Sequence, residues 1–433
     1  MQGPKLKYKR IVKTEERLDN PHHDLYVNKP DGTSGLSGRI VLIMAVACGV
    51  SVANLYWAQP LLDTIARAFG TGTATAGLIV TFTQIGYAIG LIFIVPLGDL
   101  LERKRLIITI SFFIFVSLVI AALSPSIHFF IAASLVVGVT SVVVQILVPF
   151  AASLALDHER GAVVGKVMSG TLLGILFART LAGIISELAG WRAVFGFAAI
   201  LILALTALLW RSLPKHRHPL DMSYPRLLSS IRHLVRTEPV LRTRSVYGAL
   251  VFADFSVLWT SLTFLLAGAP YHFSDAIIGL FGLVGAAGAV MANVAGRLAD
   301  RGHANRTTIV LLLLNLGAFL LMIPGTGHLF PVILGILMLD AGVQGTHITN
   351  QSEIYRLSPE ARSRLTTVYM TSYFSGGAIG SATSAAIYSS HGWTGVCVLG
   401  MVYGATAILF WLLEQTKFRK RSPSGAGTAP LPS

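Results

Sequence analysis

The sequence carries few charged residues for its length. Only 12% of its 433 residues are Asp, Glu, Lys or Arg, whereas roughly 25% is typical of soluble domains. Hydrophobic residues make up 53%, and the mean hydropathy is +0.68. Apolar runs of about 18 residues or more recur along the chain, and each is long enough to cross a bilayer. This composition excludes a set of soluble domains and predicts a polytopic membrane protein with helical spans.

Several kinds of chemical motif are missing. The two cysteines, Cys48 and Cys397, both lie within apolar runs, so we expect neither a disulfide framework nor a metal cluster from them. The sequence lacks a Gly-Lys-Ser/Thr phosphate-binding loop, a His/Cys/Asp cluster with metal-ligand spacing and a nucleophile elbow. We therefore expect no ATP-driven pump, no metal site, no cofactor and no enzyme.

Positive charge is abundant and unevenly placed. The net charge is +14, and nearly all of the 34 Lys and Arg residues lie in the two tails, in the central loop or in every second loop between spans. This asymmetry follows the positive-inside rule, which predicts that both termini and the central loop are cytoplasmic. The basic residues therefore indicate topology, and nucleic acid is not an expected partner.

The apolar runs divide the chain into two sets of six spans. The first set is expected near 40–57, 75–97, 106–123, 127–154, 163–186 and 193–213. The second set is expected near 245–267, 275–295, 307–323, 330–350, 365–388 and 394–413. The predicted domains are a disordered cytoplasmic tail (1–38), a six-helix bundle (39–213), a cytoplasmic linker (214–244), a second six-helix bundle (245–413) and a second tail (414–433). Apolar residues at helical spacing among cations predict that the linker carries a short helix on the inner membrane surface.

A charged loop motif occurs once in each set of spans. Each copy has a Gly, an acid four positions later and an adjacent Arg: Gly98, Glu102 and Arg103 in the first, Gly296, Asp300 and Arg301 in the second. The copies lie about 200 residues apart, which indicates that the chain contains two copies of one unit. Because six is an even number, both units enter the membrane from the same side, so the repeats are parallel.

These motifs and this plan resemble the major facilitator superfamily of secondary transporters, from Arg39 to Leu413. The resemblance implies an all-α integral membrane fold of about twelve transmembrane helices in two parallel six-helix repeats. It also implies that the loop motifs form a conformational latch, in which an acid and an Arg engage nearby charges and helix termini and favour one rocking state. The expected latch residues are Gly98, Asp99, Glu102, Arg103, Gly296, Asp300, Arg301 and Glu353.

The fifth span resembles the antiporter motif of drug and proton exchangers in this superfamily. Small residues recur from Gly170 to Gly183 at the spacing of that motif, but Arg179 stands where the motif has a proline. The family's fourth-span Arg corresponds here to Ser134. The stripe therefore retains close helix packing without the proline bend.

Three ionisable residues lie inside predicted spans: Arg179 in the fifth, Asp254 in the seventh and Asp340 in the tenth. Each costs roughly 2.5–3.5 kcal/mol near the centre of a span, so each must face a partner or a hydrated cavity. Apolar surroundings favour the neutral form of a carboxyl group, which allows proton exchange near neutral pH. We expect Asp254 and Asp340 to couple protons and Arg179 to act as a counter-charge or an anion anchor. The alternative is a static Arg–Asp pair that holds the two bundles in register.

Polar and aromatic residues near mid-depth complete the candidate substrate cavity: Asn54, Gln59, Gln84, Tyr87, Gln145, Trp259, Gln344, His347, Tyr369 and Tyr373. Each of them could instead form a hydrogen bond between helices. His347 follows Asp340 by seven residues and therefore shares its helix face. That spacing is compatible with a proton relay or with a hydrogen-bonded core histidine.

Together these features predict a secondary active transporter of the inner (cytoplasmic) membrane that works by alternating access. Segments 54–61, 168–171 and 354–365 resemble bacterial efflux permeases, which implies proton-coupled efflux of a drug, a sugar or another small metabolite. Uptake by proton symport is the alternative, because no residue encodes direction. A membrane-embedded enzyme would need a nucleophile or a metal site, and a transport-dead sensor would not need three charges within its spans. The expected partners are substrate, protons and the lipid bilayer, and one chain is expected to function as a monomer.

Overall fold

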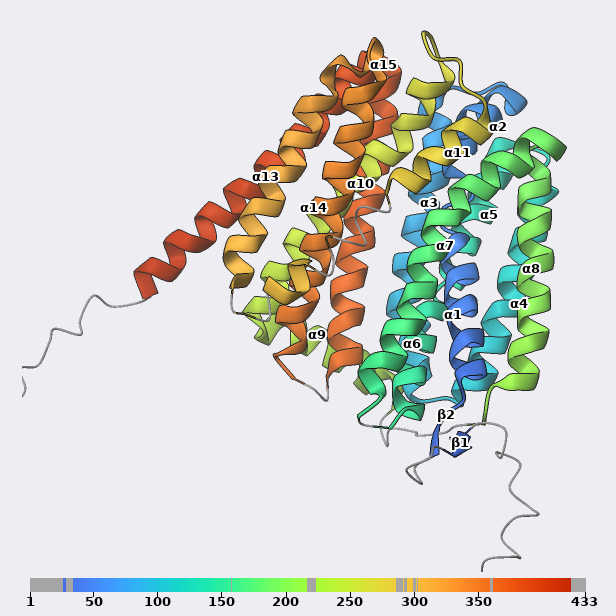
Figure 1. Cartoon of the computed structure of the whole chain (residues 1–433), viewed down its shortest axis with the longest axis vertical. Coiled ribbons are helices and arrows are strands. Elements are labelled where there is room, and N and C mark those ends of the chain that lie inside the picture. The colour runs from blue at the N-terminus through green and yellow to red at the C-terminus, as the bar shows by residue number, and fades with distance from the viewer. Residues whose placement is uncertain are drawn as a thin grey trace, which may run out of the picture.

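The computed structural model describes residues 26–28, 34–156, 158–215, 223–285, 291, 294–298, 301, 303–358 and 361–421. Helices account for most of these residues, and the long ones run side by side along one common direction (Figure 1). The arrangement follows from the apolar runs, because a helix satisfies every backbone hydrogen bond within its own segment when no water is available.

The first half of the bundle contains the spans of the N-terminal repeat. These are α1 (Gly38–Ala53), α3 (Thr73–Phe93), α4 (Arg103–Ala122), α5 (Ile127–Thr140) with α6 (Val143–Leu154), α7 (Arg160–Ala189) and α8 (Trp191–Ser212). The short elements η2 (Gln59–Leu61) and α2 (Leu62–Phe69) connect α1 to α3, and η3 (Val95–Asp99) connects α3 to α4. Gly70 ends α2 with a φ of 62°, a left-handed conformation that favours glycine.

The second half contains the spans of the C-terminal repeat. These are α10 (Pro239–Ala267), α11 (Asp275–Val284), α13 (Ala304–Met322) with η5 (Ile323–Thr326), α14 (Leu329–Tyr355) and α15 (Arg362–Arg421). The long α15 holds two spans, because Gly392 breaks the helix with a φ of 58°. Nine described helices are long and apolar enough to cross a membrane, and α1 and α11 are shorter apolar helices. With α15 counted twice, these helices account for the two predicted sets of six and confirm the all-α membrane fold.

The first predicted span, 40–57, is helical only as far as Ala53. The chain then turns, and the indole of Trp57 donates a hydrogen bond of 3.0 Å to the side-chain oxygen of Asn54. The short helix η2 then begins at Gln59, with Pro60 in its first turn. Most side chains of residues 54–61 are buried in the core of the bundle at this turn, so the segment does not extend α1.

The fourth predicted span, 127–154, is divided into α5 and α6 around residues 141–142. The hydroxyls of Thr140 and Ser141 donate hydrogen bonds of 2.8 and 2.6 Å to the carbonyls of Val136 and Val137. Such bonds to the carbonyl four residues earlier bend helices. The sequence showed one continuous apolar run here, and only these side-chain contacts reveal the break.

The elements outside the spans mark the two ends of the bundle. The strands β1 (Tyr26–Asn28) and β2 (Ser34–Leu36) pair in antiparallel fashion within the segment predicted to be a disordered tail. Helix α9 (Tyr224–Thr237) forms in the linker where helical spacing predicted it. Figure 1 places β1, β2 and α9 at one end and α2 at the other. We call these the α9 end, predicted to be cytoplasmic, and the α2 end.

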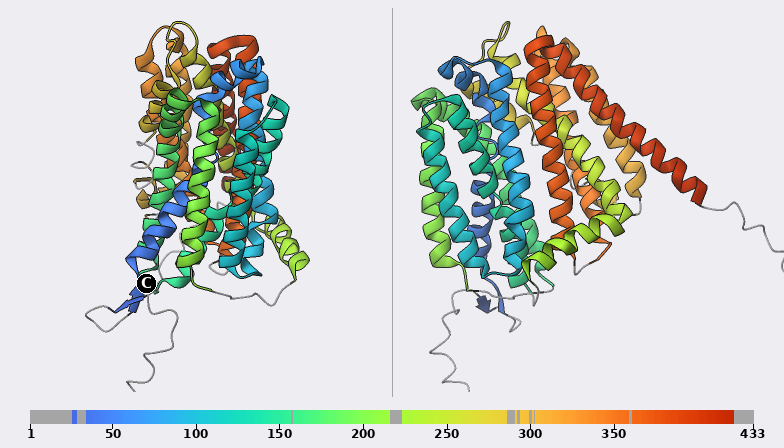
Figure 2. Two further views of the ribbon diagram at one scale, coloured as in Figure 1. Left: turned by 90° about the vertical axis from the view of Figure 1, so that its right-hand side faces the viewer. Right: turned by 180° about the vertical axis from the view of Figure 1, so that it is seen from behind.

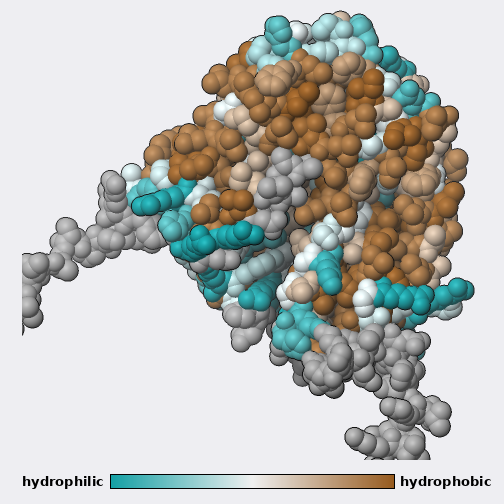
Figure 3. Space-filling view, in the orientation of Figure 1, coloured by the Kyte–Doolittle hydropathy of each residue, from teal (hydrophilic) through white to brown (hydrophobic). Residues whose placement is uncertain are grey.

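The two halves meet along two seams. Helix α3 packs against α15, and α7 packs against α11. Figure 2 shows the two groups of helices standing close at the α2 end and spreading apart toward the α9 end. Hydrophobic residues cover most of the flank in Figure 3, while hydrophilic residues gather at the ends. An apolar flank of this kind suits contact with lipid acyl chains.

Within the first half, α1 and α7 approach closely at small residues. A Cβ atom added at Gly170 would collide with the carbonyl oxygen of Ala45, and one at Gly174 would collide with that of Gly49. Because both obstacles are backbone atoms, a larger residue would force the helices apart. Small residues allow this contact in membranes as they do in other helix pairs.

Gly174→Ala is expected to destabilise the protein by about 1–3 kcal/mol, because the added methyl group overpacks the α1–α7 contact. The matched control is Gly196→Ala on α8, where an added Cβ meets no atom within 4 Å. The melting temperatures of both variants would be measured in detergent. Equal melting temperatures for the two variants would show that the α1–α7 contact tolerates the extra atom.

Candidate substrate and proton site

A cavity of about 220 Å³ lies between the two halves and contains two of the three charged residues predicted within spans. Helices α7, α10, α11 and α14 form its wall. The lining residues are Leu172, Leu173, Ile175, Leu176, Arg179, Phe255, Gly282, Gly285, Asp340 and Gln344. The cavity is therefore apolar on the α7 side apart from one guanidinium, with a carboxylate and an amide on α14. Apolar pockets with a few convergent polar groups are typical ligand sites.

Arg179 projects from α7 and is only 3% exposed. Its Nε donates a hydrogen bond of 2.8 Å to Oε1 of Gln59, and Nη1 lies 3.4 Å from the carbonyl oxygen of Ile175. Its Nη2 is buried and has no hydrogen-bond partner among the described residues. One guanidinium nitrogen is thus available to a bound molecule.

Aromatic rings surround the same guanidinium. Its central carbon lies 3.9 Å from the ring centroid of Trp259, 4.6 Å from that of Tyr56 and 5.6 Å from that of Phe255. Cation–π attraction is strongest for Trp and grows when the cation is desolvated. These rings therefore stabilise the buried positive charge without a carboxylate in direct contact.

Asp340 projects from α14 toward the same rings. Its Oδ1 accepts a hydrogen bond of 3.2 Å from the indole nitrogen of Trp259. Its Oδ2 lies beside Gly285, the residue that follows α11, where an added Cβ would collide with it. Within the described part of the chain, Arg179 and Asp340 form no ion pair of 4.0 Å or less. The static pair considered as an alternative is therefore not formed here, and Trp259 connects the two charged groups instead.

Asp254, the third charged residue predicted within a span, lies outside this cavity. It is 1% exposed, its Oδ1 has no hydrogen-bond partner among the described residues, and it does not line the cavity. Tyr247 and Ser261 share its face of α10, being seven residues away on either side. Tyr247 donates a hydrogen bond of 2.6 Å to Glu414, and Ser261 lies 2.6 Å from Ser384, both on α15. This face of α10 points into the second half, toward α15.

Five of the other predicted cavity residues lie in the first half. Gln59 contacts Arg179, and its backbone carbonyl accepts a hydrogen bond of 2.7 Å from Thr263. Gln84 donates to Ser256 across the halves at 3.0 Å, and Gln145 donates to Tyr87 at 3.3 Å. Asn54 contacts Trp57 in the turn after α1. These side chains act as hydrogen-bonding links in this structure, and of the five only Gln59 bonds to a charged residue of the cavity, Arg179.

Three predicted residues form a cluster in the second half. Nδ1 of His347 lies 3.0 Å from the hydroxyl of Tyr369, and the ring of Tyr373 lies 4.8 Å from the imidazole. Tyr373 in turn stacks on Phe252 at 4.0 Å. His347 therefore has a tyrosine partner, and no contact within the described residues joins it to Asp340. Gln344, one turn after Asp340 on α14, does line the cavity.

No motif in the sequence pointed directly to Tyr56, Phe255, Gly282 or Gly285. Phe255 lies one turn before Trp259 and shares its helix face, so helical spacing could have identified it. Tyr56 lies in the turn that ends α1, which hydropathy had assigned to a span. Gly282 and Gly285 open space beside Arg179 and Asp340, and nothing in the pattern of apolar residues signals such space.

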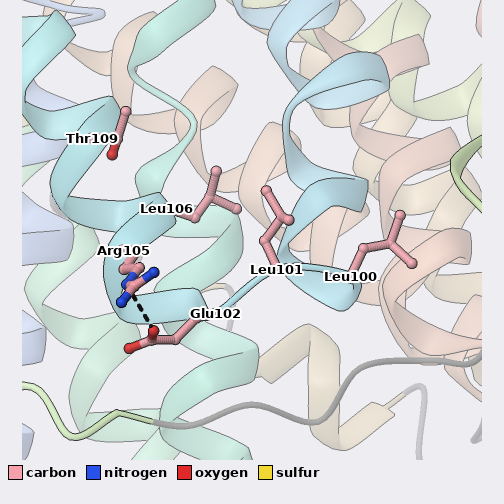
Figure 4. A pocket seen from close by; sticks show the side chains of 6 residues that line it. All are labelled: Leu100, Leu101, Glu102, Arg105, Leu106 and Thr109. Carbon is pink, nitrogen blue, oxygen red and sulfur yellow. Dashed lines mark ion pairs between the residues drawn. The ribbon is translucent and has the colours of Figure 1, made fainter.

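The first copy of the loop motif makes a contact between the halves. Arg103 pairs with Asp99 at 3.5 Å and donates to the carbonyl of Gly98 at 3.1 Å. The other carboxylate oxygen of Asp99 accepts a hydrogen bond of 3.1 Å from Ser363 of α15. Glu102 pairs with Arg105 at 3.1 Å, and both line a surface cavity of about 360 Å³. Figure 4 shows these two side chains side by side.

The second copy is described only in part. Gly296 and Arg301 are described, and Arg301 is exposed, whereas Asp300 lies outside the described residues. Glu353 pairs with Arg356 at 3.0 Å and with Arg244 at 3.9 Å, both in the second half. Among the described residues, no group of three or more His, Cys, Asp or Glu side chains could hold a metal ion.

Residues 42–354 match the Major Facilitator Superfamily. The Escherichia coli O157:H7 transporter YgaY is 49% identical over 87% of this chain and 95% of its own length. A Streptomyces coelicolor transporter is 35% identical, over 88% of each chain. A Helicobacter pylori protein named as a probable sugar efflux transporter is 23% identical, over 83% of this chain and 91% of its own.

Among solved structures, the fold is similar to a bacterial homologue of the human lysosomal transporter Spinster in its inward-facing, occupied conformation. The TM-score is 0.72 at 14% identity, with 90% of this chain and 98% of that chain covered. The family match covers more than half of the chain. The fold contains the two sets of spans described above. The chain is a multi-pass membrane transporter and belongs to the Major Facilitator Superfamily.

Proposed function

We propose that this transporter exports a small polar molecule in exchange for protons, with Arg179 and Asp340 at the coupling site. One observation carries the proposal: the guanidinium and the carboxylate share Trp259 in one cavity between the halves without pairing. Each group retains an atom with no hydrogen bond among the described residues, Nη2 of Arg179 and Oδ2 of Asp340. Nη2 can therefore donate a hydrogen bond to a substrate, and Oδ2 can accept one from a substrate or take a proton.

The chemistry of the two groups suggests how exchange would occur. An ionised Asp340 accepts a hydrogen bond from a hydroxyl or ammonium group of the substrate, and Arg179 donates to an acceptor group on the same molecule. A proton on Asp340 removes that acceptor site. Proton and substrate then compete for one carboxylate, which is the condition for antiport. Substrates with both donor and acceptor groups, such as sugars and amino-substituted drugs, fit this arrangement.

The contacts between the halves support a state that is closed at the α2 end. Asp275 of α11 accepts hydrogen bonds from Thr64 at 2.7 Å and from Ser186 at 2.6 Å. Thr81 and Ser381 lie 2.8 Å apart on the α3–α15 seam. We propose that the α9 end faces the cytoplasm, that both termini lie there, and that this state is inward-facing. A bacterial inner membrane is the proposed location, and one chain with bundles at 39–213 and 245–413 is the proposed functional unit.

Proton symport in the uptake direction is the second candidate, and the same pair of residues accommodates it. A substrate carrying a carboxylate or phosphate would bind Arg179, and protonation of Asp340 would remove the competing negative charge. Proton and anion would then bind together. Resemblance of three segments to efflux permeases favours export, as does the name of the Helicobacter pylori relative.

Asp340→Asn is expected to lower substrate-driven proton flux by at least about tenfold, which corresponds to about 1.4 kcal/mol of barrier. The amide preserves the shape and the contact with Trp259 but cannot exchange a proton. Purified protein in proteoliposomes with an imposed pH gradient and a pH-sensitive dye would be given sugars, cationic drugs and organic anions in turn. The sign of the flux separates antiport from symport.

Asp254→Asn is the matched control, since it removes a buried carboxylate that does not line the cavity. It is expected to retain proton flux with the compound that moves protons in the wild type. If Asp340→Asn retains flux and Asp254→Asn loses it, the coupling site lies within the second half and the proposed site is wrong. If both lose flux, two carboxylates share the proton pathway.

Ser363→Ala is expected to favour wider opening at the α9 end, because it removes the one described hydrogen bond from α15 to Asp99. A neutral donor to a charged acceptor contributes about 1.5–3 kcal/mol, so the open population should rise roughly tenfold or more. Spin labels at Arg211 and Arg306, both exposed, would report the distance between the halves once Cys48 and Cys397 are replaced. Ser372→Ala, which removes only a hydroxyl bonded to its own helix, is the control. An unchanged distance distribution for Ser363→Ala would exclude a latch at Asp99.

A further inference from the structure

A groove on the outside of the first half lies apart from the transport site. It runs between α1 and α7, which Figure 1 shows side by side, and its volume is about 440 Å³. Its lining residues are Gly38, Val41, Leu42, Ala45, Val46, Lys166, Ser169, Gly170 and Leu173. Most of them are apolar or small, and one is a cation.

The groove opens toward the membrane. Leu42 is 63% exposed and Leu173 is 51% exposed, although both are large hydrophobic residues. The face of α7 that carries Leu173 continues as an exposed apolar stripe at helical spacing: Phe177, Leu181, Ile184 and Leu188. Such a stripe on a transmembrane helix contacts acyl chains. The groove is therefore a recess in the lipid-facing surface and not a branch of the central cavity.

Close packing of the two helices gives the recess its depth. Its floor lies at Ala45 and Gly170, where the α1 and α7 backbones touch because Gly170 has no side chain. Leu42, Val46 and Leu173 form the walls above that floor. If the recess were empty in a bilayer, the side chains that line it would lose dispersion contacts. A lipid acyl chain is therefore its natural occupant.

The charge at one end of the groove selects the kind of lipid. Lys166 lies near the α9 end of α7, which begins at Arg160, and it is exposed. Within the part of the chain that the structure describes, Lys166 forms no ion pair. The neighbouring hydroxyl of Ser169 bonds to the backbone carbonyl of Lys166 at 2.7 Å. An ammonium that lacks an ion-pair partner among the described residues and stands beside an apolar recess matches a phosphate attached to an acyl chain.

We propose that the α1–α7 groove binds one anionic phospholipid, with an acyl chain against Ala45, Gly170 and Leu173 and the headgroup phosphate at Lys166. The site involves no residue of the cavity around Arg179 except the outward side of Leu173, so it stands independently of the proposed transport cycle. The lipid would fill the space between the α9-end segments of α1 and α7.

Native mass spectrometry of delipidated protein in detergent, titrated with dioleoyl phosphatidylglycerol or dioleoyl phosphatidylcholine, tests the proposal. The wild type should bind the first molecule of phosphatidylglycerol more tightly than phosphatidylcholine. Lys166→Gln should weaken the first phosphatidylglycerol by about fivefold, which is about 1 kcal/mol for one Lys near an anionic headgroup, and leave phosphatidylcholine unchanged. Val46→Trp should weaken both lipids, because the indole fills the groove.

Matched controls separate this groove from general lipid adhesion. Arg67→Gln removes an exposed cation at the α2 end, and Leu203→Trp adds an indole to an exposed position on α8. Neither should change the first binding constant. The proposal is overturned if Lys166→Gln leaves the preference for phosphatidylglycerol intact, or if Val46→Trp binds both lipids as the wild type does. Melting temperatures equal to the wild type would show that each variant is folded.

Discussion

The position of Arg179 over the ring of Trp259 is the interaction on which the centre of this molecule depends. A guanidinium in a membrane span must be compensated, and here three aromatic rings and Gln59 surround it. Because the rings compensate the charge, Asp340 is not required as a partner. The carboxylate can therefore accept a hydrogen bond from Trp259 with one oxygen and keep the other oxygen free. A direct ion pair at this place would have used the atoms that the proposed function assigns to substrate and proton.

Close helix contacts surround this centre within the first half and between the halves. The α1–α7 contact depends on Gly49, Gly170 and Gly174, and the α7–α11 seam depends on Gly183 and Gly279, which lie against backbone atoms of the opposite helix. One helix, α7, thus takes part in both contacts and also carries Arg179. A movement of α7 relative to α11 would directly change the contacts of the guanidinium. Relative motion of the halves at the α7–α11 seam would therefore change the geometry around Arg179.

Much of the fold followed from the sequence because hydropathy and length determine which segments can span a bilayer. The break between α5 and α6 was missed, since it depends on where two hydroxyl groups bond. The candidate site was predicted only in outline. Asp254 and Asp340 are both acids in the middle of a span. They differ in whether their face of the helix points into the cavity, and hydropathy does not indicate that direction. Tyr56 was missed because the early end of α1 turns its ring toward Arg179, and Gly285 was missed because a residue without a side chain leaves no hydrophobic signal.

The carboxylate of Asp275 has a consequence for how the α2 end opens. It accepts one hydrogen bond from α2 and another from α7, one on each oxygen. If α11 moves away from α2 and α7, both of these hydrogen bonds must break. Hydrogen bonds to a charged group contribute about 1.5–3 kcal/mol each, so the two donors together oppose such a separation by roughly 3–6 kcal/mol. One carboxylate thus concentrates the resistance to opening at a single point of that end.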